Sequence, residues 1–259
     1  MKRRTFFAGA AGAGLAVPAA QGAPRKAVME LTYVRMRNSS DNQYRRTSQF
    51  ISTSLAPATK RAGSGPIGLF SNLIGEQSPT ILMLTAYASL VDLELVSGKL
   101  AADERFAKEV AEFSGEPGLA FQRIEKALLQ GFDSFPGVEI PPSDEKRGSR
   151  VFELRIYESD NFATLHRKMG MFDNGEIDLF RKVGMAPVFF GETLIGTNMP
   201  NLTYMVGYDS LGAREEVWGK FGRSPEWQKM RKLPGLSDAE VVSNISNRMY
   251  RPISGSDIR

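Results

Sequence analysis

Two stretches of the chain, Pro66–Gly75 (PIGLFSNLIG) and Pro187–Gly196 (PVFFGETLIG), begin with Pro, end in Leu-Ile-Gly and have the same length. The offset of 121 residues continues without a gap to residues 108 and 229, with 13 identities in 43 positions. Earlier in the chain, Val28–Leu31 matches Val151–Leu154 at an offset of 123, so a length change of two residues lies between the two matches. A register held over this length predicts two copies of one structural unit.

Each copy has a pattern that predicts the order strand, helix, strand, strand, helix, strand. In the second copy, residues 151–157 alternate apolar and polar side chains, as a half-buried strand does. Residues 165–183 have helical spacing up to Gly184, and Ser210 and Ser224 are placed to cap helices over 211–221 and from Pro225. Further strands are expected at 187–195, 202–208 and 241–250. The first copy is expected to close with a strand within 119–132, where residues 125–130 also fit a helix.

This order of elements is that of a ferredoxin-like module, an α+β unit with helices on one face of an antiparallel sheet. The other sheet face needs cover, and two modules in one chain can place these faces together. We therefore expect two tandem ferredoxin-like (βαββαβ) modules that pair as an intramolecular dimeric α+β barrel. We assign residues 27–133 to module 1, 134–149 to a linker, 150–252 to module 2 and 253–259 to a tail.

The first 23 residues have the features of an export signal. Arg3 and Arg4 precede a short apolar run rich in Ala and Gly, and small residues suited to signal peptidase follow. Twin arginines before a weakly hydrophobic run resemble a bacterial Tat signal; the alternative is a basic N-terminus without structure. We predict a signal peptide at residues 1–23, export to the periplasm or the cell exterior, and no later membrane span.

The composition excludes several classes of function. The 259 residues contain no Cys and one His, which excludes disulfides, thiolate nucleophiles and Cys- or His-rich metal sites. Residues 1–23 hold three of the 33 Lys and Arg residues and none of the 29 acidic residues, so the remainder is nearly neutral. A nearly neutral chain lacks the basic field that nucleic-acid binding uses. We predict no metal site and no nucleic-acid partner; an all-oxygen Ca²⁺ or Mg²⁺ site is the alternative that this composition leaves open.

The second copy resembles the NIPSNAP family of dimeric α+β-barrel proteins. The residues that carry the resemblance are Val151–Tyr157 (VFELRIY), Tyr208–Glu215 (YDSLGARE) and Ser224–Gln228 (SPEWQ). The first copy matches as a diverged module, since it has Tyr87-Ala-Ser-Leu without the Asp and Asp103-Glu-Arg-Phe in place of Ser-Pro-Glu-Trp. The resemblance implies the barrel fold. The wider superfamily includes small monooxygenases, haem-degrading enzymes and haem peroxidases, which are analogies of fold alone.

The first strand of the second copy supplies the main candidate ligand-binding residues. Phe152, Leu154 and Ile156 alternate with Glu153, Arg155 and Tyr157. If the helices cover the apolar face, the second set points into the barrel, where a buried carboxylate and guanidinium need partners. Glu30 repeats Glu153 in the first copy, whereas Thr32 replaces Arg155, so the interior would be asymmetric. The pattern predicts either a structural ion pair between the modules or recognition of a polar ligand.

The single imidazole is a further candidate. His166 lies near a predicted helix start beside Arg167 and Lys168, so it is either a ligand or general base or an exposed surface residue. Asp209 and Ser210 are expected to cap a helix, and Trp227 is expected in the core. A Gly-rich phosphate loop, a nucleophile elbow and paired carboxylates are all missing, so no catalytic residue is assigned.

These observations predict an exported, soluble protein that binds a small molecule or a protein partner in or beside the barrel. We expect no cofactor, with haem as the alternative. One alternative function is a cofactor-free or haem-using monooxygenase-like enzyme, and another is an inert structural or interaction protein. The tandem modules are compatible with a monomer that contains an internal pseudo-dimer and with a homo-oligomer.

Overall fold

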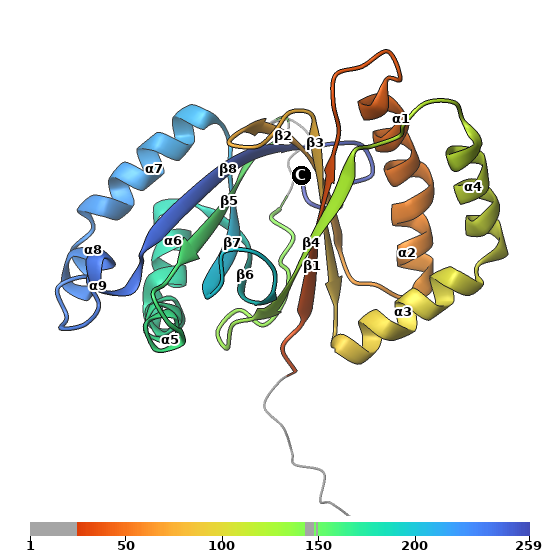
Figure 1. Ribbon diagram of the computed structural model, residues 1–259. Coiled ribbons are helices and arrows are strands. Elements are labelled where there is room, and N and C mark those ends of the chain that lie inside the picture. Colours follow the sequence, from red (N-terminus) through yellow and green to blue (C-terminus); the bar gives the residue numbers. More distant parts are fainter. Residues whose placement is uncertain (1–24, 143–147, 149) are drawn as a thin grey trace, which may run out of the picture.

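Eight strands close into one antiparallel barrel, and the helices pack around its outside in two groups (Figure 1). This computed structural model describes residues 25–142, 148 and 150–259. The predicted signal peptide, with Arg3 and Arg4, lies outside the described residues. The helices between residues 43 and 115 cover one side of the barrel, and those between residues 162 and 241 cover the other (Figure 1). Within the described ranges, no helix has the length and apolar character needed to cross a membrane.

The two halves of the chain contain their elements in nearly the same order. Module 1 contains β1 (Val28–Arg35), α1 (Gln43–Phe50), the π-helical turn η1 (Ile51–Leu55), α2 (Ala56–Ala62), β2 (Ile67–Ile74), β3 (Thr80–Tyr87), α3 (Leu90–Ala102), α4 (Glu104–Gly115) and β4 (Arg123–Gly131). Module 2 contains β5 (Val151–Glu158), α5 (Phe162–Met171), the π-helical turn η2 (Phe172–Glu176), α6 (Ile177–Val183), β6 (Ala186–Ile195), β7 (Asn201–Tyr208), α7 (Leu211–Arg223), α8 (Pro225–Met230), α9 (Asp238–Val241) and β8 (Asn244–Pro252).

The order of strands around the barrel is β1-β3-β2-β8-β5-β7-β6-β4. Within each module the first strand lies between the third and fourth, as in a ferredoxin-like sheet. The modules join at two seams, where β2 pairs with β8 and β4 pairs with β6. The last strand of each module therefore pairs with the second strand of the other module. This confirms the predicted tandem ferredoxin-like modules and the intramolecular α+β barrel.

Some elements differ from their predicted ranges. The helix expected over residues 165–183 is divided into α5, η2 and α6, because Asn174 and Gly175 leave the helical conformation. Gly184 ends α6 with a φ of 101°, the left-handed conformation expected of a C-terminal cap. Residues 125–130 form part of strand β4 and not a helix. The last strand begins at Asn244 because the residues before it form α9, which Ser237 caps.

Strands β1, β3, β5 and β7 are buried on both faces along almost their whole length. The interior is filled by apolar side chains from both modules: Met29, Leu31, Tyr33, Phe70, Leu82, Leu84, Leu129, Phe152, Leu154, Val188, Phe189, Met205, Tyr250 and Ile258. Tyr157 belongs instead to the cluster that joins the sheet of module 2 to its helices. Because neighbours on a strand face opposite ways, Glu153 and Arg155 also face the helices. The expectation that these residues point into the barrel is therefore wrong.

One end of the barrel is closed by residues 134–142, the described first part of the linker, and by the tail. Val138 and Ile258 pack against the interior cluster. The N–H of Glu139 donates to the Val188 carbonyl at 2.8 Å, and the N–H of Asp257 donates to the Ile67 carbonyl at 2.9 Å. In Figure 1 the C-terminus lies among the strands in the middle of the molecule. We call the opposite end, where β1 ends at residue 35 and β8 begins at residue 244, the open end.

Candidate functional site

A buried polar network surrounds Glu153, whose side chain is fully buried on β5. Its carboxylate accepts hydrogen bonds from Arg214 (Nε 2.9 Å and Nη2 2.6 Å) and from Nη1 of Arg155 (2.9 Å). The Tyr208 hydroxyl donates at 2.7 Å and the Trp218 indole N–H at 3.2 Å. Arg214 and Trp218 lie on α7, so the network joins this helix to the sheet.

The second arginine of the network is held among aromatic rings. The Nη2 group of Arg155 donates to the Tyr157 hydroxyl at 3.0 Å, and Tyr204 donates to the same oxygen at 2.9 Å. The guanidinium of Arg155 lies 4.4 Å from the centre of the Trp218 ring, a cation–π distance. Sequence reasoning found Arg155 and Tyr157 but missed Tyr204 and Trp218, which lie far along the chain.

Electrostatics keep Glu153 charged and Tyr208 neutral. Burial opposes ionisation of Glu153, but hydrogen bonds from Arg214 and the charge of Arg155 lower its pKa below the ordinary value. Burial and the nearby charge of Glu153 raise the pKa of Tyr208, so its hydroxyl stays protonated and donates. Every buried polar atom of the network has a partner among the described residues. The network is therefore a satisfied structural ion pair, and it lies within module 2 and not between the modules as expected.

The same layer contains a second buried pair that sequence reasoning missed. Lys168 on α5 and Glu176 at the end of η2 are almost fully buried, and the Lys168 ammonium donates to both carboxylate oxygens at 2.9 and 3.1 Å. The rings of Phe172 and Trp227 lie 4.8 and 5.2 Å from the ammonium. The available signal was the position of Lys168 on the face of the predicted helix that also carries apolar residues.

Glu30 does not join the Glu153 network. It lies on β1 in module 1, where its carboxylate accepts from Lys126 at 2.9 Å and from the Thr32 hydroxyl at 3.0 Å. Its partner Lys126 is largely exposed. At an offset of 121, Leu93 stands where module 2 has Arg214, so module 1 has no equivalent network.

His166 lies on the surface of module 2. Its side chain is 61% exposed, and its Nε2 atom is 3.5 Å from a carboxylate oxygen of Glu192. Haem binding uses a large apolar pocket with an axial ligand aimed into it. The surroundings of His166 do not fit that group, so we assign no haem step to this residue. In the described part of the chain, no group of His, Asp and Glu residues could hold a metal ion. Trp227 is buried in the core as predicted.

Replacing His166 by alanine is expected to leave the protein unchanged in folding and in its absorption spectrum. The side chain is exposed and makes one long ion-pair contact, which contributes well under about 1 kcal/mol. Visible spectroscopy of the purified full chain, together with a thermal unfolding curve, provides the measurement. Loss of a visible absorption band in His166→Ala would contradict this assignment.

The open end of the barrel contains a small cavity of about 90 Å³. Strands and turns of both modules line it with Leu31, Tyr33, Arg35, Glu125, Lys126, Ala127, Ile156, Thr193, Thr197, Asn201, Thr203 and Arg248. None of these residues was proposed from the sequence as a ligand-binding residue. The cavity therefore depends on the closing of the barrel, which brings together strands from distant parts of the chain.

Two arginines and two glutamates form a charged cluster at this cavity. Arg35 donates to Glu125 through Nε (3.0 Å) and Nη2 (2.8 Å), and it also pairs with Glu76. Arg248 approaches the same Glu76 carboxylate at 2.8 Å, and the Tyr250 hydroxyl donates to it at 3.2 Å. A single buried carboxylate is thus shared by two guanidinium groups.

The ring of Tyr33 lies close to both guanidinium groups. Its centre is 5.0 Å from the guanidinium of Arg35 and 5.6 Å from that of Arg248. Burial raises the pKa of Tyr33 to about 12, so the phenol is protonated at neutral pH. Leu31 and Ile156 provide aliphatic surface in the same cavity. The site therefore combines fixed positive charge, a neutral hydroxyl and apolar contact.

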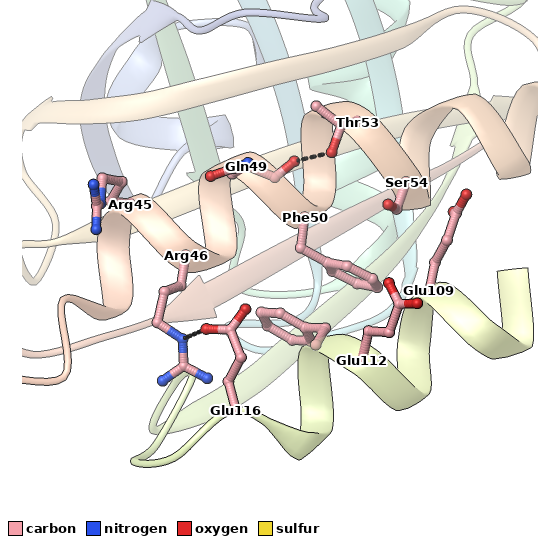
Figure 2. A pocket seen from close by; sticks show the side chains of 10 residues that line it. Arg45, Arg46, Gln49, Phe50, Thr53, Ser54, Glu109, Glu112 and Glu116 are labelled. Atoms are coloured by element: carbon pink, nitrogen blue, oxygen red, sulfur yellow. Dashed lines mark hydrogen bonds and ion pairs between the residues drawn. The ribbon is translucent and has the colours of Figure 1, made fainter.

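A larger groove of about 360 Å³ lies on the helices of module 1, between α1, η1 and α4 (Figure 2). Figure 2 shows the Arg46 side chain directed towards Glu116, and their charged groups are 2.7 Å apart. Phe50 and Phe113 also line the groove, and their stacked rings have centres 4.2 Å apart. The groove is open to solvent, and its charges of opposite sign face one another across it. We assign no function to it.

Comparison with known proteins agrees with the fold and the duplication. A family model described as NIPSNAP matches residues 40–132 and 152–257, which together make up more than half of the chain. The chain belongs to the NIPSNAP family. The same family model matches both segments, as expected of two copies of one unit. Among curated proteins, none matches this NIPSNAP sequence significantly.

Solved structures with the same fold include two provisionally described as monooxygenases. One, from Lactobacillus acidophilus NCFM, has 10% identity and a TM-score of 0.57, covering 89% of this chain and 97% of its own. The other, from Fusobacterium nucleatum, has 9% identity and a TM-score of 0.55, covering 88% and 92%. An anthrone oxidase-like protein has 14% identity and a TM-score of 0.50, covering 89% and 93%. At these identities the likeness concerns the fold alone.

Proposed function

We propose that this NIPSNAP-family protein binds a small organic anion, a short carboxylate, in the cavity at the open end of the barrel. The observation that carries the proposal is the pair of arginines, Arg35 and Arg248, held side by side at a cavity with aliphatic walls. Guanidinium groups recognise carboxylates through charge-assisted hydrogen bonds. The aliphatic walls suit the hydrocarbon part of such a ligand.

The balance of charge around the cavity favours an anion. Glu76 is buried and is shared by Arg35 and Arg248. Glu125 is 41% exposed and also accepts a hydrogen bond from Arg123, so solvent and a second arginine reduce its negative field at the cavity. The buried Arg35 and the half-buried Arg248 therefore bring more positive charge to the cavity than the shared Glu76 and the solvent-screened Glu125 offset.

The neutral groups of the cavity are already hydrogen-bonded. The Asn201 side-chain oxygen accepts from the hydroxyls of Thr193 at 2.6 Å and Thr203 at 3.2 Å. The Asn201 amide donates to two backbone carbonyls, those of Thr197 and Asn198. This side of the cavity is fixed in conformation, and the arginines supply the charge for recognition.

The cavity supports binding better than catalysis. A general base for an oxygenase reaction would have to accept a proton at neutral pH. The raised pKa of Tyr33 keeps this phenol protonated, and the two glutamates at the cavity are held in ion pairs with arginine. We therefore propose a binding protein. The two structures described as monooxygenases share the fold of this chain at 10% and 9% identity, and this likeness does not assign their activity to it.

Binding of propionate by the full chain, measured by calorimetry or ligand-observed NMR, tests the proposal. Propionate is expected to bind, and propylamine, which has a similar size and the opposite charge, is not. Arg248→Gln is expected to weaken propionate binding by about tenfold or more, the value of a lost charge-assisted hydrogen bond. Arg251→Gln on the same strand is the matched control, because Arg251 is exposed and faces away from the interior.

Two outcomes would contradict the proposal. One is equal binding of propionate and propylamine. The other is propionate binding that Arg248→Gln and Arg251→Gln change to the same extent. Thermal unfolding of each variant shows whether a loss of binding reflects a loss of the fold.

A further inference from the structure

The two halves of the open end differ in the side chains that fill them, although the repeat relates their backbones. The strand order β1-β3-β2-β8 of one half recurs as β5-β7-β6-β4 in the other. Each position in one half therefore has a counterpart in the other half, related by the pseudo-twofold axis of the barrel. A difference in size between two counterpart side chains shows where the interior leaves space.

Arg248 on β8 and Ala127 on β4 are such counterparts, separated by the repeat offset of 121 residues. Ala127 pairs with Leu31 of β1. Arg248 pairs with Leu154 of β5, which is the repeat equivalent of Leu31. Strands β4 and β8 are four strands apart in the closed order of eight, so Ala127 and Arg248 lie on opposite sides of the barrel. Both residues line the cavity at the open end.

The backbone surroundings of the two positions are alike. A glycine follows the second strand of each module, Gly75 after β2 and Gly196 after β6. A β-carbon added to Gly75 would lie 3.2 Å from the Cα atom of Arg248, and one added to Gly196 would lie 3.8 Å from that of Ala127. The barrel accepts a long side chain at this position in one half. The space in the other half therefore results from the short side chain of Ala127.

An ion pair fills the half that contains Arg248. The guanidinium of Arg248 pairs with Glu76 at 2.8 Å and lies 5.6 Å from the centre of the Tyr33 ring. At the offset of 121 residues, Ala127 stands in place of Arg248 and Thr197 in place of Glu76. Ala127 and Thr197 both line the cavity. The cavity thus occupies the place where a second ion pair is missing.

We propose that Ala127 determines which carboxylate chain length the cavity accepts. The inference rests on the proposed carboxylate binding and adds the residue that limits the size of the ligand. With the carboxylate held by Arg35 and Arg248, the hydrocarbon part extends across the barrel towards Ala127. Leu31, which pairs with Ala127, and Ile156 provide further apolar contact with it.

Propionate binding by Ala127→Leu, measured by calorimetry on the full chain, tests this role. The leucine side chain would extend into the space that the hydrocarbon part of the ligand uses. Propionate binding is expected to weaken by about tenfold or more, because one excess methylene group in an apolar pocket already has an effect of this size. Ala111→Leu is the matched control, since it makes the same change at an exposed position of α4, and it is expected to bind propionate as the natural chain does.

The opposite change tests the length limit itself. Ala127→Gly removes one methyl group from the cavity wall, and its binding of propionate and butyrate is compared with that of the natural chain. The ratio of butyrate affinity to propionate affinity is expected to rise by about fourfold, the value of one buried methylene group. Circular dichroism and thermal unfolding show whether each variant is folded. If Ala127→Leu does not fold, Ala127→Gly still decides the question.

The outcomes separate this inference from the proposed function. Absence of propionate binding by the natural chain would overturn both. Binding that Arg248→Gln weakens and Ala127→Leu leaves unchanged would preserve the carboxylate site and overturn the role of Ala127. Equal losses in Ala127→Leu and Ala111→Leu would also overturn that role, as would a ratio of affinities that Ala127→Gly does not change.

Discussion

Replacing Glu153 by glutamine is expected to lower the free energy of unfolding by about 3–5 kcal/mol, the usual cost of removing one partner from a buried ion pair. Glu153 is fully buried and accepts hydrogen bonds from both Arg155 and Arg214. An amide has one oxygen and no charge, so Arg155 would remain buried without its counter-charge. The attachment of α7 to the sheet through Arg214 and Trp218 would also weaken.

Urea unfolding of the full chain measures this effect, and the repeat provides a matched control. Glu30→Gln changes the equivalent position in module 1, where the partner Lys126 is largely exposed. Exposed ion pairs contribute at most about 1 kcal/mol, so this variant should unfold nearly as the natural chain does. Equal losses of stability in Glu153→Gln and Glu30→Gln would show that burial of the network has no special effect.

The pH dependence of the same network has a defined sign. The pKa of Glu153 is lower in the folded protein than its ordinary value, so ionised Glu153 stabilises the fold above the unfolded pKa of about 4.3. This contribution is lost as the pH falls through the lower, folded value. The difference in stability between the natural chain and Glu153→Gln should therefore shrink on acidification below about pH 4.

Replacing Lys168 by methionine is expected to be destabilising to a similar degree, about 3–5 kcal/mol at neutral pH. The change preserves most of the side-chain volume but leaves Glu176 buried without its cation. In the double variant Lys168→Met/Glu176→Leu, the second substitution also removes the carboxylate that has lost its cation. The double variant should regain much of the lost stability, because an apolar pair can replace a buried ion pair.

The sign of the pH dependence is opposite for this pair. Burial raises the pKa of Glu176 even with Lys168 present. Without Lys168 the carboxyl group is stable in the fold only when protonated, so Lys168→Met should lose stability as the pH rises above the unfolded pKa of about 4.3. Thermal unfolding at pH 5 and pH 8 measures this. A single variant no less stable than the double variant at pH 8 would contradict the assigned role of the pair.

The fold was predictable because it is repeated. Pro66–Gly75 and Pro187–Gly196 revealed the duplication, and the alternation in residues 151–157 identified a strand. The direction of that strand was not predictable. Strand β5 is buried on both faces, by the barrel interior and by the helices, so alternation does not show which face is inside. Here the apolar Phe152 and Leu154 fill the barrel, and the mixed face meets the helices.

The candidate sites were predictable only in part. Glu153 and Arg155 stood out as a charged pair on a strand, and the expected asymmetry with Glu30 is present, although in the helical layer. The cavity at the open end was not found, because Arg35 and Arg248 are neighbours only after β1 and β8 enter the same barrel. The pair of Lys168 and Glu176 was missed because charged residues on a helix usually face solvent.

The linker that joins the two modules has a consequence for mutational tolerance. In a dimer of two identical chains, every amino-acid change appears twice, at both symmetry-related positions. In this chain a change appears once, which allowed Arg155 and Arg214 to accompany Glu153 while Thr32 and Leu93 occupy the corresponding places in module 1. A saturation scan should therefore find Glu153, Arg155 and Arg214 less tolerant of substitution than Glu30, Thr32 and Leu93, which occupy the corresponding positions of module 1.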